Sequence, residues 1–323
     1  MICPCACRDQ RGEPPGPFMF QASFSATASS LRRATVLVGI IPRPTSRLQQ
    51  IQQHVSSKFH SSTPFAMPPV TPPTSEHYDL LVIGGGSGGM GASRRAASYG
   101  KKVAVIEEAG KLGGTCVNVG CVPKKLMWHA SDIQDKLKEA HEYGFTDAGR
   151  SFSVPSVDWH TLAEKRDAYI RRLNGIYDNN LQKDHVAYIS GHGRLLGDGR
   201  VQVTPGVDGA LKKEVTLSAD HIVVATGGRP SIPSDDDIPG ASLGTDSDGF
   251  FAWREQPKRV AVVGAGYIAV ELAGVLHSLN SETHLLIRHD SFLRNFDPII
   301  SDTLMQYMGN TGLHVHKSTN VKR

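Results

Sequence analysis

The chain has 323 residues, of which 39% are hydrophobic, so it can bury a sizeable core and form about two domains. Its formal net charge is +4, with 35 Lys and Arg against 31 Asp and Glu, and this balance gives no reason to expect a nucleic-acid partner. No stretch approaches the roughly 18 apolar residues that a membrane-spanning helix needs, so we expect no such helix.

Residues 1–76 differ in composition from everything that follows them. They carry more Arg and Lys than Asp and Glu and are rich in Ser, Thr, Gln and Pro, so they cannot form a core. This composition is typical of a mitochondrial transit peptide, and initiation at Met67 would yield a cytosolic form, so we expect both locations. The alternative is a tail or an upstream sequence with no targeting role. The spacing of Cys3, Cys5 and Cys7 matches no ordinary zinc pattern, so we predict no metal site.

Residues 78–106 have the pattern of a strand, a helix and a second strand. The near-continuous apolar run 78–83 predicts a parallel strand that is covered on both faces. The glycine-rich turn 84–89 follows at once and leads into a helix over 90–99 and a second buried strand over 102–106. A G-x-G-x-x-G turn between a strand and a helix is the context in which this motif binds a dinucleotide.

The residue types in this turn match the needs of a bound pyrophosphate. Gly84 permits the tight turn, Gly86 lets the backbone approach the phosphates, and Gly89 lets the helix pack close to the strand. The helix N-terminus supplies N–H donors and a partial positive charge. Glu107, at the end of the second strand, is placed to accept hydrogen bonds from an adenosine ribose. The alternative is a glycine-rich turn that binds nothing.

A second unit of the same kind follows towards the C-terminus. It consists of a strand over 258–263, a glycine turn over 264–269, a helix over 270–279 and a strand over 283–287. One chain therefore carries two dinucleotide-binding patterns.

The two units differ in charge where each would meet the ribose. Glu107 ends the second strand of the first unit, whereas Arg288 stands at the matching place in the second, with Arg294 one short loop further on. Arginine suits the 2′-phosphate of NADPH, which an acidic residue would repel. We therefore predict NADPH at the second site, and the alternative is a pair of solvated arginines.

Cys116 and Cys121 follow the first glycine turn as a C-x4-C motif. A regular helix would separate positions five apart by about 7.5 Å along its axis, beyond the reach of a disulfide. A bridge therefore needs a bent segment, and Gly120 is the residue most able to bend it. Such a bridge is a poor structural staple and is typical of labile, catalytic disulfides. The alternatives are two unrelated buried thiols or a zinc site.

Two dinucleotide sites and a dithiol make an electron path. Hydride passes from a nicotinamide to a flavin, and the reduced flavin opens a disulfide that lies against it. Because the cysteines follow the first glycine turn, the flavin has to be the ligand of the first site. A neighbouring cation or a helix N-terminus would lower the pKa of a reactive thiol in this place.

Taken together, these motifs resemble those of the pyridine nucleotide-disulfide oxidoreductases. The resemblance runs from residue 78 to the C-terminus and rests on segments 84–89, 113–125, 225–228, 245–251 and 264–271. It implies an α/β fold of two Rossmann-like dinucleotide-binding domains, in which the FAD domain carries an inserted, incomplete NADPH domain. The cofactors that it implies are FAD and NADPH.

The resemblance also divides the chain. It implies a leader over 1–76, an FAD-binding domain with the redox-active disulfide over 77–256 and a partial NADPH-binding domain over 257–323. We expect no counterpart in this sequence to the family's dimerisation domain, which makes the homodimer and supplies a His–Glu acid–base pair. We expect this chain alone to fold poorly, to bind flavin weakly and to turn over little substrate. Two hypotheses remain open, a shortened sequence of the full enzyme and a real non-catalytic nucleotide-binding fragment.

The resemblance implies a role for each matching side chain. Cys116 is similar to the thiol that attacks the substrate disulfide, and Cys121 to the thiol that contacts the flavin. Lys124 is similar to the lysine beside the flavin, paired with Glu271, and the alternative for this pair is a salt bridge without a catalytic role. The implied FAD contacts are Gly84, Gly86, Ser87, Gly88, Gly89, Glu107, Thr115, Cys116, Lys124, Gly193, Thr226 and Ser247. The implied NADPH contacts are Ala265, Gly266, Tyr267, Ile268, Glu271, Arg288 and Arg294.

The implied substrate is glutathione disulfide, contacted by Ser87, Arg94 and Tyr177. Its carboxylates favour a cationic contact, and Arg94 stands where the family provides one. Members that act on lipoamide carry an acidic residue where this chain has Arg288. Members of the large thioredoxin-reducing type depend on a C-terminal redox tail, which this sequence does not show. These related reductases remain the alternatives.

Overall fold

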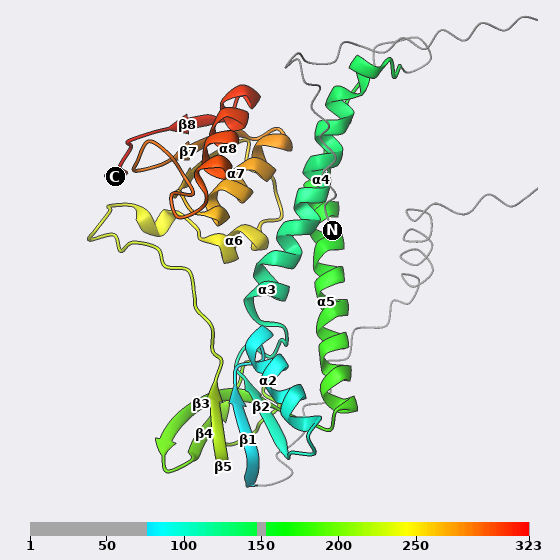
Figure 1. Cartoon of the computed structure of the whole chain (residues 1–323), viewed down its shortest axis with the longest axis vertical. Coiled ribbons are helices and arrows are strands. Elements are labelled where there is room, and N and C mark those ends of the chain that lie inside the picture. The colour runs from blue at the N-terminus through cyan, green and yellow to red at the C-terminus, as the bar shows by residue number, and fades with distance from the viewer. Residues whose placement is uncertain (1–75, 147–152, 323) are drawn as a thin grey trace, which may run out of the picture. The chain divides into compact units, whose positions relative to one another are not determined.

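The computed structural model describes residues 76–146 and 153–322, and all of these residues belong to one of the two units into which the chain divides (Figure 1). The predicted leader, with Met67 and its three cysteines, lies outside the described residues except for Glu76. Within the described ranges, no helix combines the length and the apolar character needed to cross a membrane.

Five strands form the first sheet, and its pairing closes on itself in the order β1-β2-β3-β4-β5. β1 pairs in parallel with both β2 and β5, and β2 pairs in parallel with β3. The β3–β4 and β4–β5 pairs are antiparallel, which closes the sheet. The strands are β1 (His77–Ile83), β2 (Val103–Glu107), β3 (Ala187–Gly197), β4 (Arg200–Pro205) and β5 (Val215–Val224).

Alternate residues of these strands fill two cores. Leu81, Ile106 and Ile189 belong to a cluster enclosed by the five strands. Val82 and Val105, the sequence neighbours of Leu81 and Ile106, pack with Met90 of helix α2 (Ser87–Ala97) on the other face. The central parallel strands are therefore apolar on both faces, as the sequence predicts, because each face has a core to fill.

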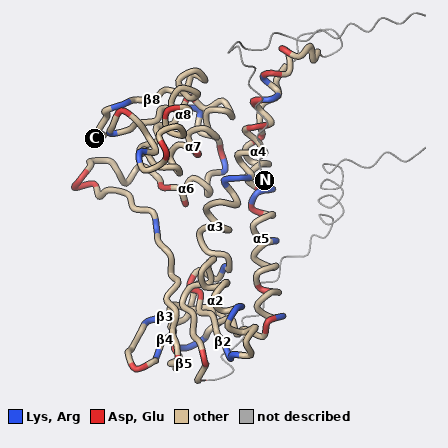
Figure 2. Tube along the Cα trace, viewed as in Figure 1, with Lys and Arg blue, Asp and Glu red and all other residues tan. Residues whose placement is uncertain are grey.

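Two long helices follow the first strand–helix–strand unit. The short helix α3 (Gly114–Val119) leads into α4 (Cys121–Glu139), which ends in a single 3-10 turn at Ala140–Tyr143. α5 (Trp159–Lys183) is preceded by Asp158, whose carboxylate caps the helix by accepting from the N–H of Thr161. α4 and α5 lie side by side, and both helices carry acidic and basic residues (Figures 1 and 2).

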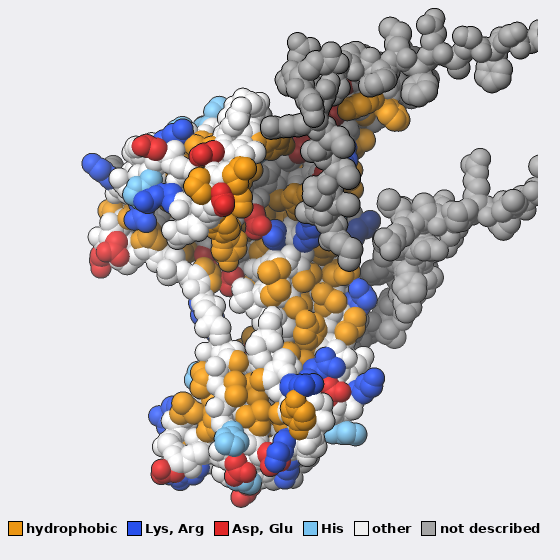
Figure 3. All heavy atoms as spheres, viewed as in Figure 1, with side chains coloured by type: hydrophobic (Ala, Val, Ile, Leu, Met, Phe, Trp, Pro, Cys, Tyr) orange, Lys and Arg blue, Asp and Glu red, His pale blue; other side chains and the backbone are white. Residues whose placement is uncertain are grey.

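The second sheet is parallel, with strand order β6-β7-β8. Residues of α7 and α8 pack with Leu285 and Ile287 in one core. α8 also exposes Ile299, Ile300 and Tyr307, and apolar side chains are visible on the face drawn in Figure 3. The elements are the 3-10 turn Ala241–Leu243, α6 (Ser247–Ala252), β6 (Arg259–Val263), α7 (Tyr267–Ser278), β7 (Glu282–Leu286), α8 (Pro298–Thr311) and β8 (His314–His316).

A separate apolar cluster joins helices from different parts of the chain. Met127 of α4, Trp159 of α5 and Phe250 of α6 pack with Leu276 of α7. The fully buried Arg166 adds polar links, since its Nη2 donates to the carbonyl oxygen of Phe251 at 2.6 Å. α7, which follows the second glycine turn, is therefore packed against the helices that follow the dithiol.

Both predicted strand–helix–strand units are confirmed. The first unit runs from β1 through α2 to β2, and the second from β6 through α7 to β7, each within a few residues of the expected bounds. The fold is therefore mixed α/β with parallel strands. The antiparallel strands β4 and β5, which close the first sheet, are not among the predicted elements.

Candidate functional site

Gly84 and Gly89 of the first glycine turn leave no room for a side chain. Gly84 has φ +108°, and a Cβ at this position would overlap the carbonyl oxygen of Ala225. A Cβ on Gly89 would overlap the carbonyl oxygen of Gly84, so α2 approaches β1 as closely as the sequence predicts. Gly86 precedes α2 as its N-cap residue, and a Cβ added to Gly86 would meet only Gly114, at 3.5 Å. The turn thus presents the N-terminus of α2 with little cover.

Glu107 ends β2 and turns back to this glycine turn. Its Oε2 accepts from the backbone N–H of Gly85 at 2.7 Å, and its Oε1 accepts from that of Ala109 at 2.8 Å. A carboxylate offers about four acceptor sites, so lone pairs remain for ribose hydroxyls. The position and the remaining acceptor capacity both fit the predicted adenosine contact.

The segment that carries the dithiol is joined directly to the same turn. The N–H of Gly113 donates to the carbonyl oxygen of Gly85 at 2.8 Å. A Cβ on Gly114, which has φ +58°, would lie only 2.6 Å from the Cα of Gly86. α3 starts at Gly114, so Cys116 lies within the first turn of a helix that begins against the first glycine turn.

A pair of asparagines holds this junction, and sequence reasoning missed it. Asn174 of α5 donates through Nδ2 to the carbonyl oxygen of Leu112 at 2.8 Å and to Oδ1 of Asn118 at 3.0 Å. Asn118 in turn donates to the carbonyl oxygen of Gly114 at 2.9 Å. The long helix α5 therefore fixes the approach to the dithiol. Because 62 positions separate Leu112 from Asn174, no local pattern reveals the contact.

The chain bends between the two cysteines at the predicted residue. Gly120, with φ −144° and ψ −121°, separates α3 from α4, and a Cβ there would lie 2.8 Å from the carbonyl oxygen of Thr115. Cys116 is partly buried, Cys121 is exposed, and both are free thiols in this structure. The bend brings Cys121 close enough to act on the pKa of Cys116.

The pKa of Cys116 differs from the expectation of a lowered value. It is raised, first because of the hydrogen bond with Cys121 and then because of burial. Lys124 acts in the opposite direction, but its effect is smaller. The reduced Cys116 therefore holds its proton more tightly than an isolated thiol, and it needs a proton acceptor before it can attack.

Lys124 and Glu271 meet as predicted. The Nζ of Lys124, in the first turn of α4, lies 2.8 Å from Oε1 of Glu271 on α7. The two side chains are 27% and 39% exposed, so this ion pair contributes little stability. The ion pair does link α4, which begins at Cys121, to α7, which follows the second glycine turn. Whether it also acts in catalysis remains a prediction.

The second glycine turn has an equally open helix N-terminus. Gly264 has φ +146°, and a Cβ on Gly266, the N-cap residue of α7, would meet no atom within 4 Å. The N–H of Leu293 donates to the carbonyl oxygen of Ala265 at 2.8 Å, which ties the loop before Arg294 to this turn. Arg288 and Arg294 are both exposed. The helix N-terminus and both cations are therefore accessible to an anionic ligand.

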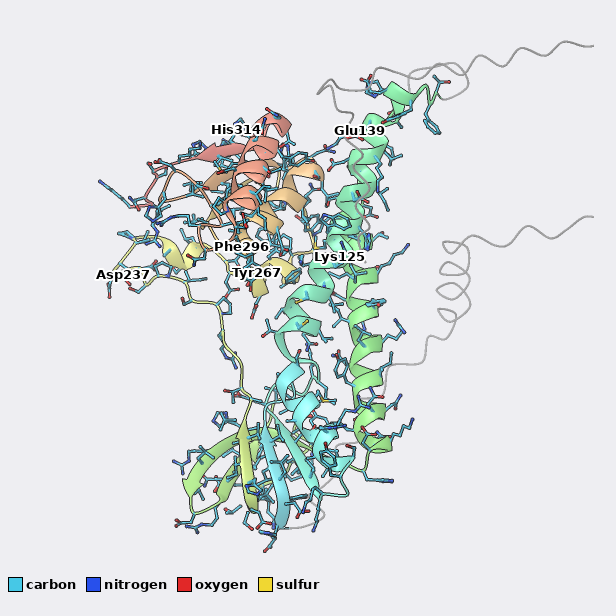
Figure 4. All side chains as sticks on the ribbon, viewed as in Figure 1. Lys125, Glu139, Asp237, Tyr267, Phe296 and His314 are labelled. Atoms are coloured by element: carbon cyan, nitrogen blue, oxygen red, sulfur yellow. The ribbon has the colours of Figure 1, made fainter. Side chains whose placement is uncertain are left out.

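Tyr267 and Ile268 open α7 and are 57% and 44% exposed. Figure 4 shows Tyr267 at this helix start, on the same part of the molecule as Phe296. A ring as exposed as that of Tyr267 is not part of a packed core, and at a helix N-terminus it is accessible to the NADPH that the resemblance implies. Its role at that site remains a prediction.

The three predicted substrate residues line one pocket. Ser87 and Arg94 of α2 and Tyr177 of α5 face a cavity of about 510 Å³. Asp184, which sequence reasoning missed, lines it too and accepts from Nε of Arg94 at 2.5 Å. The pocket therefore contains a cation whose direction is set by an acid from another helix.

The other predicted FAD contacts lie at different distances from the first turn. A Cβ on Gly84 would be 3.1 Å from the N atom of Thr226, so Thr226 borders the turn, and one on Gly193 would be 3.2 Å from the side chain of Ile83, at the end of β1. A Cβ on Gly88 would lie 3.7 Å from that of Ala225. Thr115 is exposed on α3, and Ser247 begins α6. Across the described part of the chain, no cluster of His, Cys, Asp and Glu is able to hold a metal ion.

Comparison with known proteins places this geometry in context. A family model described as pyridine nucleotide-disulphide oxidoreductase matches residues 78–323. Glutathione reductase of Schizosaccharomyces pombe is 53% identical over 247 residues, which are 76% of this chain and 51% of the relative. The glutathione reductases of Yarrowia lipolytica and Debaryomyces hansenii are 54% and 47% identical, covering 76% and 71% of this chain and 52% and 49% of the relatives. The chain spans about half the length of the curated relatives that it matches.

Proposed function

The chain belongs to the pyridine nucleotide-disulphide oxidoreductases, and from this we propose that it carries the cofactor-binding and dithiol parts of an NADPH-dependent glutathione-disulfide reductase. The observation that carries the proposal is the junction at Gly86 and Gly114, where the helix of Cys116 begins against the nucleotide-binding turn. A dithiol in this place is within reach of a flavin whose pyrophosphate lies at α2. The three relatives named glutathione reductase support the choice of substrate.

We assign one cofactor to each glycine turn. FAD belongs to the turn at 84–89, with Glu107 on its adenosine ribose, within an FAD domain over 77–256. NADPH belongs to the turn at 264–269, with Arg288 and Arg294 on its 2′-phosphate, within an inserted NADPH domain over 257–323. The open N-termini of α2 and α7 support both assignments, because each offers unpaired N–H groups to a pyrophosphate. The opposite charges of Glu107 and Arg288 support the assignment of FAD to the first turn and NADPH to the second.

Bound FAD supplies the two-electron chemistry that links NADPH to the disulfide. The chain's own part begins when Cys116, as a thiolate, attacks one sulfur of glutathione disulfide and releases the first glutathione. Cys121 then attacks the Cys116 sulfur, releases the second glutathione and restores the Cys116–Cys121 disulfide. In total, NADPH, one proton and glutathione disulfide give NADP⁺ and two glutathione molecules.

The raised pKa of Cys116 means that these reaction steps require a proton acceptor and a proton donor. Its proton has to leave before attack, and each departing glutathione thiolate has to gain one. We propose that the family's acid–base pair, contributed by the partner subunit of a homodimer, fills this role. We also propose, from the composition of residues 1–76 alone, that the protein occurs in both mitochondria and cytosol.

The proposal is tested by counting thiols without any glutathione present. The FAD-loaded, air-oxidised chain is alkylated before and after anaerobic NADPH, and labelled peptides are identified by mass spectrometry. We expect Cys116 and Cys121 to become alkylated only after NADPH, and NADH to be much less effective. Labelling that does not depend on NADPH would contradict the proposed electron path.

A further inference from the structure

An acidic residue lies beside the cation of the substrate pocket. Asp184 lines the same cavity as Ser87, Arg94 and Tyr177, and its carboxylate is bonded to the Arg94 guanidinium. An acid in a pocket for an anionic substrate is unexpected, because it repels carboxylates and lowers the net positive charge. Its presence therefore calls for a role other than charge attraction.

The geometry of the contact defines that role. Nε of Arg94 donates to Oδ2 of Asp184 at 2.5 Å. Guanidinium is a rigid plane with five N–H donors, so fixing Nε also fixes the direction of the two terminal nitrogens. Among the described residues, no other side chain forms a hydrogen bond or an ion pair with Arg94. The terminal nitrogens are thus left for a ligand.

The two partners differ in how firmly the backbone holds them. Asp184 is the C-cap residue of the long helix α5, and its N–H donates to the carbonyl oxygen of Asn180 at 3.0 Å. Its side chain is 25% exposed and short, whereas that of Arg94 is 42% exposed and long. Asp184 is therefore the fixed partner, and the flexible arginine is the one that is ordered by the contact.

We propose that Asp184 is a positioning residue for substrate binding, which holds Arg94 through Nε so that its terminal nitrogens form a preorganised fork for a carboxylate. The inference rests on the proposed function, because it takes Arg94 as the contact for a carboxylate of glutathione disulfide. A bidentate carboxylate fits the two terminal nitrogens while Asp184 occupies the Nε edge. Without Asp184, the substrate itself would have to order the arginine, which weakens binding by about three- to tenfold.

The test compares two variants of equal charge. Asp184→Asn keeps an acceptor oxygen for Nε, whereas Asp184→Ala has none, and both lose the negative charge. Isothermal titration calorimetry of the oxidised, FAD-loaded chain gives the Kd of glutathione disulfide for each. Asp198→Asn removes an exposed acid on the β3–β4 turn and serves as the control for net charge. FAD retention and the melting temperature are recorded for every variant, and Asp184→Leu, which also lacks an acceptor, replaces an alanine variant that fails to hold FAD.

We expect the alanine variant to bind glutathione disulfide about three- to tenfold more weakly than the asparagine variant. The tetraethyl ester of glutathione disulfide, which has no free carboxylate, should show no such difference. Equal Kd values for the two variants, the same difference with the ester, or no binding by the wild-type chain would overturn the inference. Failure of the proposed function is detected separately, as the absence of NADPH-dependent thiols at Cys116 and Cys121.

Discussion

Replacing Gly89 by alanine is expected to force α2 away from β1 and to damage the first nucleotide site. The added Cβ would overlap the carbonyl oxygen of Gly84 and lie 3.1 Å from Cγ1 of Val82. A backbone oxygen cannot move aside as a flexible side chain does, so the helix itself has to shift. Overpacking of this kind costs about 1–3 kcal/mol of folding free energy.

Gly91 in the same helix provides a matched control. A Cβ there would meet no atom within 4 Å. Either alanine raises helix propensity by about 1 kcal/mol, so the difference between the two variants isolates the steric term. Urea unfolding followed by circular dichroism should place Gly89→Ala about 1–3 kcal/mol below Gly91→Ala in unfolding free energy. FAD binding should weaken in the Gly89 variant, because the displaced turn carries the pyrophosphate site. Equal stability of the two variants would refute the close approach of α2 and β1.

Three further results are expected. Cys121→Ala removes the hydrogen bond that favours protonated Cys116, so the pKa of Cys116 is expected to fall. Iodoacetamide should then label Cys116 faster at pH 7 than it does in the reduced wild-type chain. An unchanged labelling rate would contradict this. Arg288→Ala should weaken NADPH binding about tenfold, the effect of one charge-assisted hydrogen bond, and leave NADH binding almost unchanged in a fluorescence titration. A double-mutant cycle on Lys124 and Glu271 should give a coupling of about 0.2–1 kcal/mol in unfolding free energy, and a coupling several times larger would mean that the pair is a structural anchor.

The sequence predicts those features of this chain that local rules determine. Glycines that a turn requires, such as Gly84, mark the places where an apolar strand ends and a helix begins. Gly120 is identified as the bend between the cysteines because a disulfide cannot span five positions of a regular helix. The contact of Lys124 with Glu271 was expected only from the family resemblance, since 147 positions separate them.

The features that escape prediction depend on contacts distant in sequence. Asp184 meets Arg94 across 90 positions, and neither residue stands in a pattern that indicates the other. The strands β4 and β5 are not among the predicted elements, and β5 closes the first sheet by pairing with β1, far from it in sequence. The pKa of Cys116 departs from expectation because the bend brings Cys121 to it, and that hydrogen bond outweighs the cation nearby.

The central claim is that the dithiol joins the two nucleotide sites in one electron path, and the most direct test is the visible spectrum of the FAD-loaded chain. One equivalent of NADPH is added without oxygen, followed by one equivalent of glutathione disulfide. For the fraction of the chain that retains FAD, the account predicts a long-wavelength band that appears with NADPH and disappears in a single turnover with the disulfide, and it predicts that the Cys116→Ser and Cys121→Ser variants do not complete this cycle. Flavin that NADPH bleaches equally in wild-type and variant chains, with no such band, would contradict the account.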